Sequence, residues 1–271
     1  EKKSDKPERH YAGLLKALSQ ESGVPVDNIV DLELCFADTQ PSNIIGINNE
    51  FICSPRLDNL FSSYATIRAI IEDDSYKNST YVNMICIFDH EEIGSTSHQG
   101  ADSPLLSKTM DRIFKVLTEK SKDVKVDALD VALKRSFCIS ADQAHSIHPN
   151  YSDKHQVNHQ VKINKGPVIK VNANQRYATD SRGVALLKTI AEKVQVPIQE
   201  IVNKNDVPCG STIGPLTAGQ TGLKVIDIGC AQLAMHSIRE TAGVLDAYYY
   251  KTLMLGFFQH FESISHNLFD H

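Results

Sequence analysis

Four ionisable side chains follow one another directly after an apolar run. The segment FDHEEIGS, residues 88–95, comes after YVNMICI and contains Asp89, His90, Glu91 and Glu92 in succession. Such groups at the end of a strand repel one another and lose solvation, so the cluster needs a cation, a proton or a substrate. The alternative is a solvated turn between a strand and a helix, because acidic turns are common. This segment alone leaves both interpretations open.

Further carboxylates and imidazoles follow other apolar runs. Asp58 stands at a turn that opens a helix after FICSPRL, and Asp142 follows RSFCIS, with His145 just beyond it. Ligands of open α/β sheets bind at the carboxyl ends of the strands, so these groups converge if their strands are neighbours. Carboxylate oxygen and imidazole nitrogen suit divalent metals such as zinc, with one position left open for water.

Each candidate also has a purely structural interpretation. Asp58 in PRLDNL is suited to cap a helix N-terminus. His145 and His148 lie three residues apart, and either can be a hydrogen-bonded loop histidine. His236 in QLAMHSIRE lies where an apolar run turns polar, and a lone histidine in such a place is more often structural. None of these residues identifies a site alone, but their joint occurrence at strand ends favours one.

Hydrophobic patterning predicts helices and strands in alternation. The expected helices are residues 11–23, 57–74, 103–120, 181–194 and 248–261. The expected strands are residues 31–38, 81–89, 135–142, 167–172 and 223–229. This order favours one α/β domain with a mixed, largely parallel sheet sandwiched by helices. Residues 143–166 are polar and rich in histidine, and we expect an extended loop near a site.

The composition excludes several classes of protein. The chain has 271 residues, 41% of them hydrophobic, which is enough for a proper core. Its formal charge of −5 lacks the basic footprint of a nucleic-acid binder. No apolar run approaches the ~18 residues that span a bilayer, so we expect no membrane span and a cytoplasmic protein. The six cysteines are scattered without a CxxC pair, and we expect reduced, mostly buried thiols.

One glycine-rich segment imitates a nucleotide-binding motif. Residues 214–221, GPLTAGQT, have the spacing of a phosphate-binding loop, but Gln220 stands where the lysine must be. Without that lysine the phosphate charge lacks its partner, so we do not expect nucleotide binding. We expect a loop that enters a short helix, with backbone N–H groups available to a carboxylate or a developing oxyanion.

Successive blocks of the sequence resemble those of one enzyme family, the M18 metallopeptidases or aspartyl aminopeptidases. The blocks are ADTQPS, SPRLDNLFS, FDHEEIGSTSHQGADSPLL, SADQAHSIHPNY, KGPVIKVNANQRYA, NDVPCGSTIGPLTA and QLAMHSIRE, in the order of the family. They extend over nearly everything from Leu32 to Leu268, so the resemblance is specific. It implies a zinc-peptidase-like catalytic domain.

The resemblance implies two zinc ions that act together, with Mn²⁺ or Co²⁺ as alternatives. Asp58 would bridge the two metals, Glu92 and His236 would complete the first, and Asp142 would bind the second. Glu91, adjacent to a ligand, would be the general base. The paired glutamates would thus divide the work, one holding a metal and the other taking a proton from the attacking water.

The family removes N-terminal Asp or Glu from peptides, so the resemblance also implies a pocket for an acidic side chain. Lys170 in PVIKVN, with His145 and Tyr177, are the candidates, because such a pocket needs a cation or several donors. The alternative for Lys170 is a strand-edge lysine that faces solvent. By the same resemblance we expect a large homo-oligomer, a dodecamer, in the cytoplasm or in the vacuole of a fungus.

The chain also departs from the family pattern. The family takes one further metal ligand from an upstream His-x-Asp motif, and no such triplet occurs in these 271 residues. We therefore interpret the chain as the C-terminal part of such an enzyme. Residues 1–30 would be the connection from an inserted dimerisation domain, and residues 31–271 the catalytic domain, incomplete at its N-terminus. We expect this chain alone to bind at most one metal ion tightly and to turn over little substrate.

Two other functions stay open. A related dinuclear deacylase or carboxypeptidase would use the same metal carboxylates on a different substrate. A truncated subunit or fragment without catalysis would be retained for assembly or as cargo. Asp-, Leu- and N-acyl substrates separate the two enzymes, and metal content together with turnover separates the third function from both.

Overall fold

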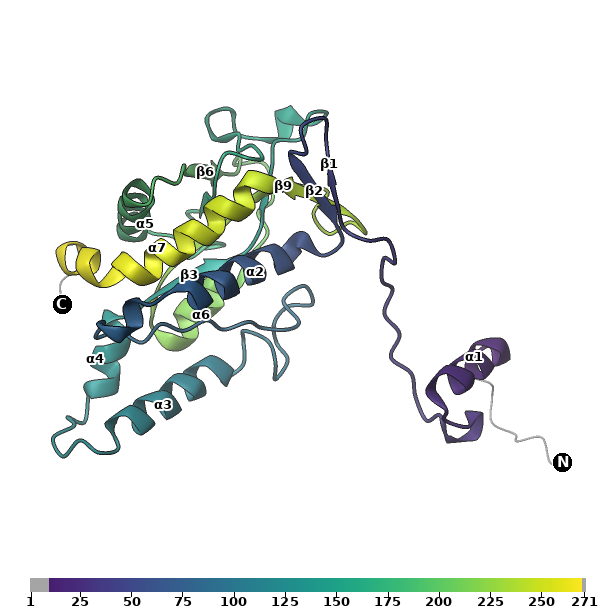
Figure 1. The fold of residues 1–271 in the computed structure, drawn as a ribbon, viewed down its shortest axis with the longest axis horizontal. Coiled ribbons are helices and arrows are strands. Elements are labelled where there is room, and N and C mark those ends of the chain that lie inside the picture. The colour runs from purple at the N-terminus through teal and green to yellow at the C-terminus, as the bar shows by residue number, and fades with distance from the viewer. Residues whose placement is uncertain (1–9, 270–271) are drawn as a thin grey trace. The chain divides into compact units, whose positions relative to one another are not determined.

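The computed structural model describes residues 10–269 (Figure 1). These residues fall into two compact units that divide between Thr39 and Gln40. The second unit carries both β-sheets and every residue of the expected site. The sequence-based division into residues 1–30 and 31–271 concerns the origin of the segments and stays a prediction.

The first unit contains α1, Ala12–Ser22, which confirms the helix predicted at residues 11–23. The helix ends at Gly23, whose left-handed φ of 72° lets its N–H group donate to the carbonyl of Ser19. No residue of α1 is buried, so tertiary packing within this unit adds little to its stability.

A four-stranded sheet forms the centre of the second unit, in the order β3-β7-β5-β6. Its strands are β3 Phe137–Ala141, β7 Lys224–Gly229, β5 Val168–Val171 and β6 Gln199–Val202. The β3–β7 and β5–β6 pairs are parallel, whereas β5 and β7 are antiparallel. Three of these strands confirm the predictions from long apolar runs, and β6 was not predicted.

A second sheet has five short strands in the order β1-β2-β9-β8-β4. They are β1 Asn43–Ile45, β2 Phe51–Ser54, β9 Glu240–Gly243, β8 Ala231–Leu233 and β4 Ala144–His145. All neighbours are antiparallel except β4 and β8. The α/β class is confirmed, but two mixed sheets replace the largely parallel one, because strands of two to four residues leave no apolar run to detect.

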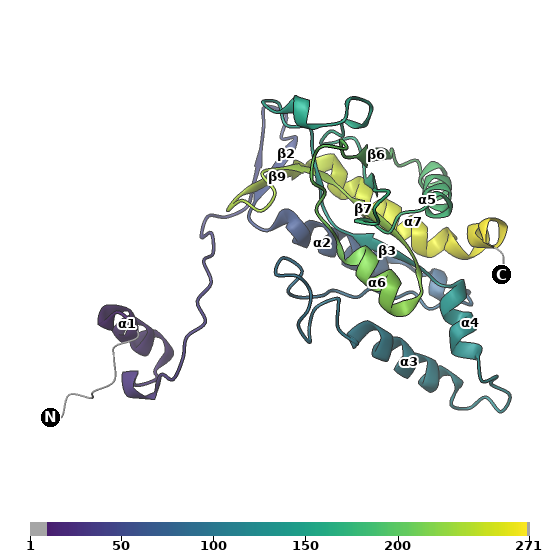
Figure 2. The ribbon, with the colours of Figure 1, turned by 180° about the vertical axis from the view of Figure 1, so that it is seen from behind.

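Helices lie on both faces of the four-stranded sheet. The remaining helices are α2 Leu57–Glu72, α3 Leu105–Thr118, α4 Ala128–Arg135, α5 Ser181–Lys193, α6 Ile213–Thr221 and α7 Val244–Leu268. Figure 1 shows α7 with α2 and α5 on one face, and Figure 2 shows α6 on the opposite face. The four predicted helices of this unit are confirmed, whereas α4 was not predicted. Helix α6 is the short helix expected at residues 214–221, where the spacing resembles that of a phosphate-binding loop.

The main hydrophobic core lies between this sheet and the helices α2, α5 and α7. Ile190 of α5, Leu253 of α7 and Ile228 of β7 are all fully buried there. The hydroxyl of Tyr250, also fully buried, donates to the carbonyl of Ile228 at 3.3 Å, so α7 is fixed to β7 by a polar bond as well as by packing.

Two predicted strands are not formed in the described part of the chain. Residues 31–38 and 81–89 carry the apolar pattern of strands, but neither pairs with another strand. Leu34 at 59% exposure and Ile87 at 53% show that these apolar side chains are not covered. An apolar run becomes a strand only where a neighbour accepts its backbone hydrogen bonds, and that neighbour is not visible in the run itself.

The cysteines are free thiols, as expected, but the expectation that most are buried is wrong. Only Cys230 is fully buried, while Cys35 and Cys86 are exposed. These two lie in the segments that form no strand. None of the described helices is long and apolar enough to cross a membrane.

The contribution of α7 to the core can be measured with two leucines of this helix. Leu253→Ala should lower the free energy of unfolding by about 2–5 kcal/mol, because it leaves a cavity in a fully buried position. Leu245→Ala is the matched control, since Leu245 is 52% exposed and should change it by less than about 0.5 kcal/mol. Urea unfolding followed by circular dichroism measures both. Equal losses in the two variants would contradict this account of the core.

Candidate metal centre

The expected site residues come from separate segments of the second unit but line one cavity of about 400 Å³. They are Asp58, Glu91, Glu92, Asp142, His145, Lys170, Tyr177 and His236. Residues of the polar, histidine-rich segment line the same cavity, including His148, His155 and His159. The structure thus brings together the candidate ligands, the candidate base and the candidate substrate-binding residues, and their individual roles stay predictions.

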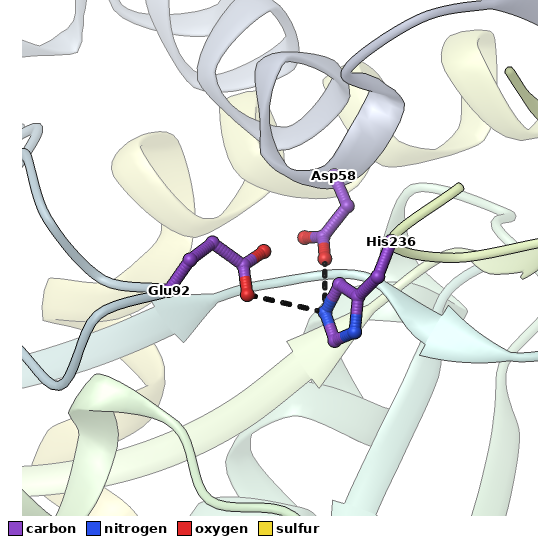
Figure 3. Close-up of side chains that lie close together, drawn as sticks. All are labelled: Asp58, Glu92 and His236. Carbon is purple, nitrogen blue, oxygen red and sulfur yellow. Dashed lines mark ion pairs between the residues drawn. The ribbon is translucent and has the colours of Figure 1, made fainter. Parts of the chain in front are cut away.

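Three of these side chains meet with donor atoms close enough to share one cation. One ligand atom each from Asp58, Glu92 and His236 lies within 4.8 Å of the others. Nε2 of His236 lies 3.2 Å from Oδ2 of Asp58 and 3.3 Å from Oε2 of Glu92 (Figure 3). The Asp58 side chain is 6% exposed and that of His236 59%, so the cluster opens to solvent on one side. Two carboxylates and an imidazole with one open side match the donors of catalytic zinc sites.

Unusual backbone conformations place these side chains. Asp58 lies in the first turn of α2 with φ −83° and ψ 110°, outside the helical region. The N-cap position belongs to Arg56, where no side chain caps the helix, so Asp58 does not serve as the cap. Arg56, His90 and His236 all have φ near 60°, which is uncommon for residues with a Cβ. Such conformations concentrate at functional sites, where the surrounding structure must impose them.

The acidic segment of residues 88–95 divides into two pairs. Asp89 and His90 stabilise the turn, because Asp89 accepts the N–H group of His90 at 2.8 Å and the His90 ring bonds the Ser97 hydroxyl at 2.6 Å. Glu91 and Glu92 line the cavity instead. The four ionisable residues therefore do not all face one another, and only the two glutamates line the cavity.

Asp142, directly after β3, reaches the same cavity. Its Oδ2 accepts from Nζ of Lys170 at 3.1 Å, and its Oδ1 accepts from the N–H group of Gln143 at 2.9 Å. The absence of a side chain at Gly229 of β7 permits this arrangement, because a Cβ there would lie 1.7 Å from the carbonyl oxygen of Asp142. Lys170 is 3% exposed, and its ammonium lies 5.4 Å from the ring centroid of Tyr177. Lys170 is therefore not a solvent-facing lysine.

Burial, followed by the crowding of carboxylates, sets the electrostatics of the cavity. Burial, followed by the charge of Asp142 and a hydrogen bond with it, raises the pKa of Asp58 to about 9. Burial and the charges of Asp142 and Glu92 also raise the pKa of Glu91. Burial acts in the same direction on Asp142, but the charge of Lys170 and several hydrogen bonds outweigh it and lower the pKa of that carboxyl. This crowding fits a divalent cation, whose charge takes the place of the proton on Asp58.

The sequence analysis did not identify three buried polar residues whose hydrogen bonds reach the candidate ligands. Gln143, Gln232 and Glu240 are 1%, 1% and 2% exposed, and they are hydrogen-bonded to one another and to the candidate ligands. Only Glu240 left a signal in the sequence, a carboxylate at the start of the short run ETAG. Its partners could not be read from that run, because they lie on other elements.

A family model described as aminopeptidase I zinc metalloprotease (M18) matches residues 1–258. The chain belongs to the M18 aminopeptidase family. Among curated relatives of this M18 chain, a probable aspartyl aminopeptidase of Ricinus communis is 45% identical over 260 residues, covering 94% of this chain and 52% of that protein. The aspartyl aminopeptidase of Aspergillus oryzae is 42% identical over 274 residues, covering 97% and 55%. The M18 chain spans about half the length of the curated relatives it matches.

Solved structures of M18 proteins have the same fold. The cryo-EM structure of a complex of Ape4 and Nbr1 matches with a TM-score of 0.89 at 40% identity, covering 100% of this chain and 52% of that one. The dodecamer of S. cerevisiae mApe1 matches with a TM-score of 0.78 at 31% identity, covering 97% and 58%. The fold implied by the sequence motifs is therefore the M18 peptidase fold.

The raised pKa of Asp58 predicts how pH acts on the metal-free protein. The folded-state pKa of about 9 lies above the ordinary 3.8, so the folded protein keeps a proton that the unfolded chain releases. This contribution to stability is complete below about pH 4 and is lost as the pH rises towards 9. Asp58→Asn removes that loss, so after chelation its melting temperature should exceed that of the parent by more at about pH 8 than at about pH 5. A difference independent of pH would contradict the crowded-carboxylate account.

Proposed function

We propose that the protein is a metal-dependent aminopeptidase that removes N-terminal Asp or Glu from peptides. The observation that carries the proposal is the cluster of Asp58, Glu92 and His236 with Glu91 in the same cavity. Similarity to two aspartyl aminopeptidases supports the substrate class. Because this chain spans about half the length of those relatives, the activity is proposed for the whole protein.

Asp58, Glu92 and His236 would hold one zinc ion, and Asp142 with Asp58 would contribute to a second. Mn²⁺ and Co²⁺ are alternative occupants, since these donors accept them as well. Bound zinc lowers the pKa of water and polarises the carbonyl of the scissile bond. Two carboxylates are one protein ligand short of the three that catalytic zinc sites have, so the second ion needs a further ligand.

Glu91 is the general base in this proposal. It lies next to the ligand Glu92 and lines the cavity, and its pKa is raised by burial and by neighbouring carboxylates. A base with a raised pKa takes a proton from water more readily than an ordinary carboxylate does. The same carboxyl group can then return the proton to the amine that leaves when the peptide bond breaks.

Lys170 supplies the positive charge for an acidic substrate side chain. In the metal-free cavity its ammonium pairs with Asp142 and lies over the ring of Tyr177. Metal binding by Asp142 would compete for that carboxylate and leave Lys170 able to pair with a carboxylate of the substrate. His145, exposed at the same cavity, is a further donor. We also propose a homo-oligomer, on the likeness to the mApe1 dodecamer.

The two glutamates should fail in different ways. Glu91→Gln should lower kcat for Asp-anilide about 10²- to 10⁴-fold and leave bound zinc nearly unchanged, because it removes only the proton acceptor. Glu92→Gln should lose both zinc and activity, because it removes a ligand. Steady-state kinetics and metal analysis by mass spectrometry measure the two effects. Full turnover by Glu91→Gln, or zinc loss equal to that of Glu92→Gln, would reject this division of roles.

Substrate selectivity tests Lys170. Lys170→Met should reduce kcat/KM for Asp- and Glu-anilides about 10- to 100-fold more than for Leu-anilide, since a charge-assisted bond is worth about 1.5 to 3 kcal/mol. The Leu substrate is the internal control for any effect on metal binding through Asp142. An equal loss on all substrates would mean that Lys170 supports the site without recognising the substrate. Turnover of N-acyl substrates instead would indicate a deacylase.

A further inference from the structure

We propose that Glu240 is a positioning residue that fixes the backbone of two metal ligands at once. Its Oε2 accepts from the N–H group of Asp58 at 2.9 Å, and its Oε1 accepts from the N–H group of His236 at 2.9 Å. Asp58 lies in the first turn of α2, whereas His236 lies between β8 and β9. One side chain therefore connects two segments that lie far apart in the sequence. The proposed cation site requires these two segments to lie side by side. This inference rests on the proposed metal centre.

The position of Glu240 is unusual for a carboxylate. Glu240 lies on β9 opposite Ser54 of β2 and is 2% exposed. A buried carboxylate is costly unless donors satisfy it. Here the donors are mostly backbone N–H groups of candidate ligands, which otherwise would need partners of their own. The burial of this charge is accounted for by the two backbone positions that it holds.

Two glutamines extend the same anchor to a third ligand. Nε2 of Gln232 donates to Oε1 of Glu240 at 3.2 Å, and Nε2 of Gln143 donates to Oε1 of Gln232 at 3.1 Å. The backbone N–H group of Gln143 donates to Oδ1 of Asp142 at 2.9 Å. The chain Glu240, Gln232 and Gln143, which we call the ligand anchor, thus links the backbones or side chains of three candidate ligands. Outer partners of this kind orient ligands and tune metal affinity.

Replacement of Glu240 by glutamine tests the anchor without a change of shape. Glutamine has one acceptor oxygen where glutamate has two, so its NH₂ group must face either the N–H of Asp58 or that of His236. A ligand backbone is then left without its acceptor and moves. Glu240→Gln should weaken zinc binding about 10- to 100-fold, the usual effect of losing an outer-shell partner. It should also change the visible absorption spectrum of the Co²⁺-loaded protein, which reports the arrangement of the ligands.

Asp246→Asn is the matched control. Asp246 is also a fully buried carboxylate, and it accepts the N–H groups of Asn164 at 2.6 Å and Gly166 at 2.8 Å. None of these residues is a candidate metal ligand. Both variants should melt at a lower temperature than the parent, but Asp246→Asn should keep the zinc affinity and the Co²⁺ spectrum of the parent. A purely structural role for Glu240 would give the same result in both variants.

Zinc titration against a chromophoric chelator and Co²⁺ spectroscopy on the purified protein decide between the outcomes. If the parent binds neither metal, the proposed metal centre fails and the inference with it. If the parent binds and Glu240→Gln binds equally well with the same spectrum, only the inference is overturned. Should Glu240→Gln not fold, Gln232→Met removes the donor that holds Oε1 of Glu240, so the carboxylate is placed less firmly at the N–H groups of Asp58 and His236. It should still weaken zinc binding relative to the parent, and unchanged affinity would overturn the inference.

Discussion

Several carboxylates share one cavity, and the structure around them must accommodate their mutual repulsion. Asp58, Glu91, Glu92 and Asp142 all line it, with the Lys170 ammonium beside Asp142 and the His236 imidazole beside Asp58 and Glu92. Burial and mutual repulsion raise the pKa of Asp58 and of Glu91, whereas Lys170 helps to keep the pKa of Asp142 low. A protein does not keep such a cluster for its own stability. A divalent cation bound there would neutralise the cluster, and the proposed peptidase chemistry depends on that binding.

The two sheets share the task of bringing these groups together. The four-stranded sheet supplies Lys170 from β5 and Asp142 at the end of β3, while the five-stranded sheet supplies the rigid frame around His236. Helix α2 adds Asp58 at its first turn. The residues with a left-handed φ include three at or beside the candidate site residues, namely Arg56, His90 and His236.

The sequence predicted what depends on long runs and local motifs. The apolar runs of β3 and β7 and the amphipathic pattern of α5 identify themselves, and the carboxylates at strand ends follow from them. Strands of two to four residues, such as β4, carry too few side chains for a period to appear. Residues 81–89 failed in the opposite way, since their apolar pattern says nothing about whether a neighbouring strand is present. The pairing of Lys170 with Asp142 also depends on β5 and β3 both lying beside β7, and no pattern within either strand could show it.

Gly229 shows how the absence of a side chain can decide where a candidate metal ligand lies. Any side chain at this position of β7 would collide with the backbone of Asp142, which lies on the adjacent segment. A deep mutational scan of this protein would therefore find position 229 as intolerant of substitution as the position of a metal ligand, although glycine has no side-chain atom that could bind a cation. In such a scan, a position can be intolerant of substitution for two reasons: its side chain takes part in binding, or there is no space for a larger side chain. The distance from a hypothetical Cβ to the neighbouring atoms distinguishes these two reasons.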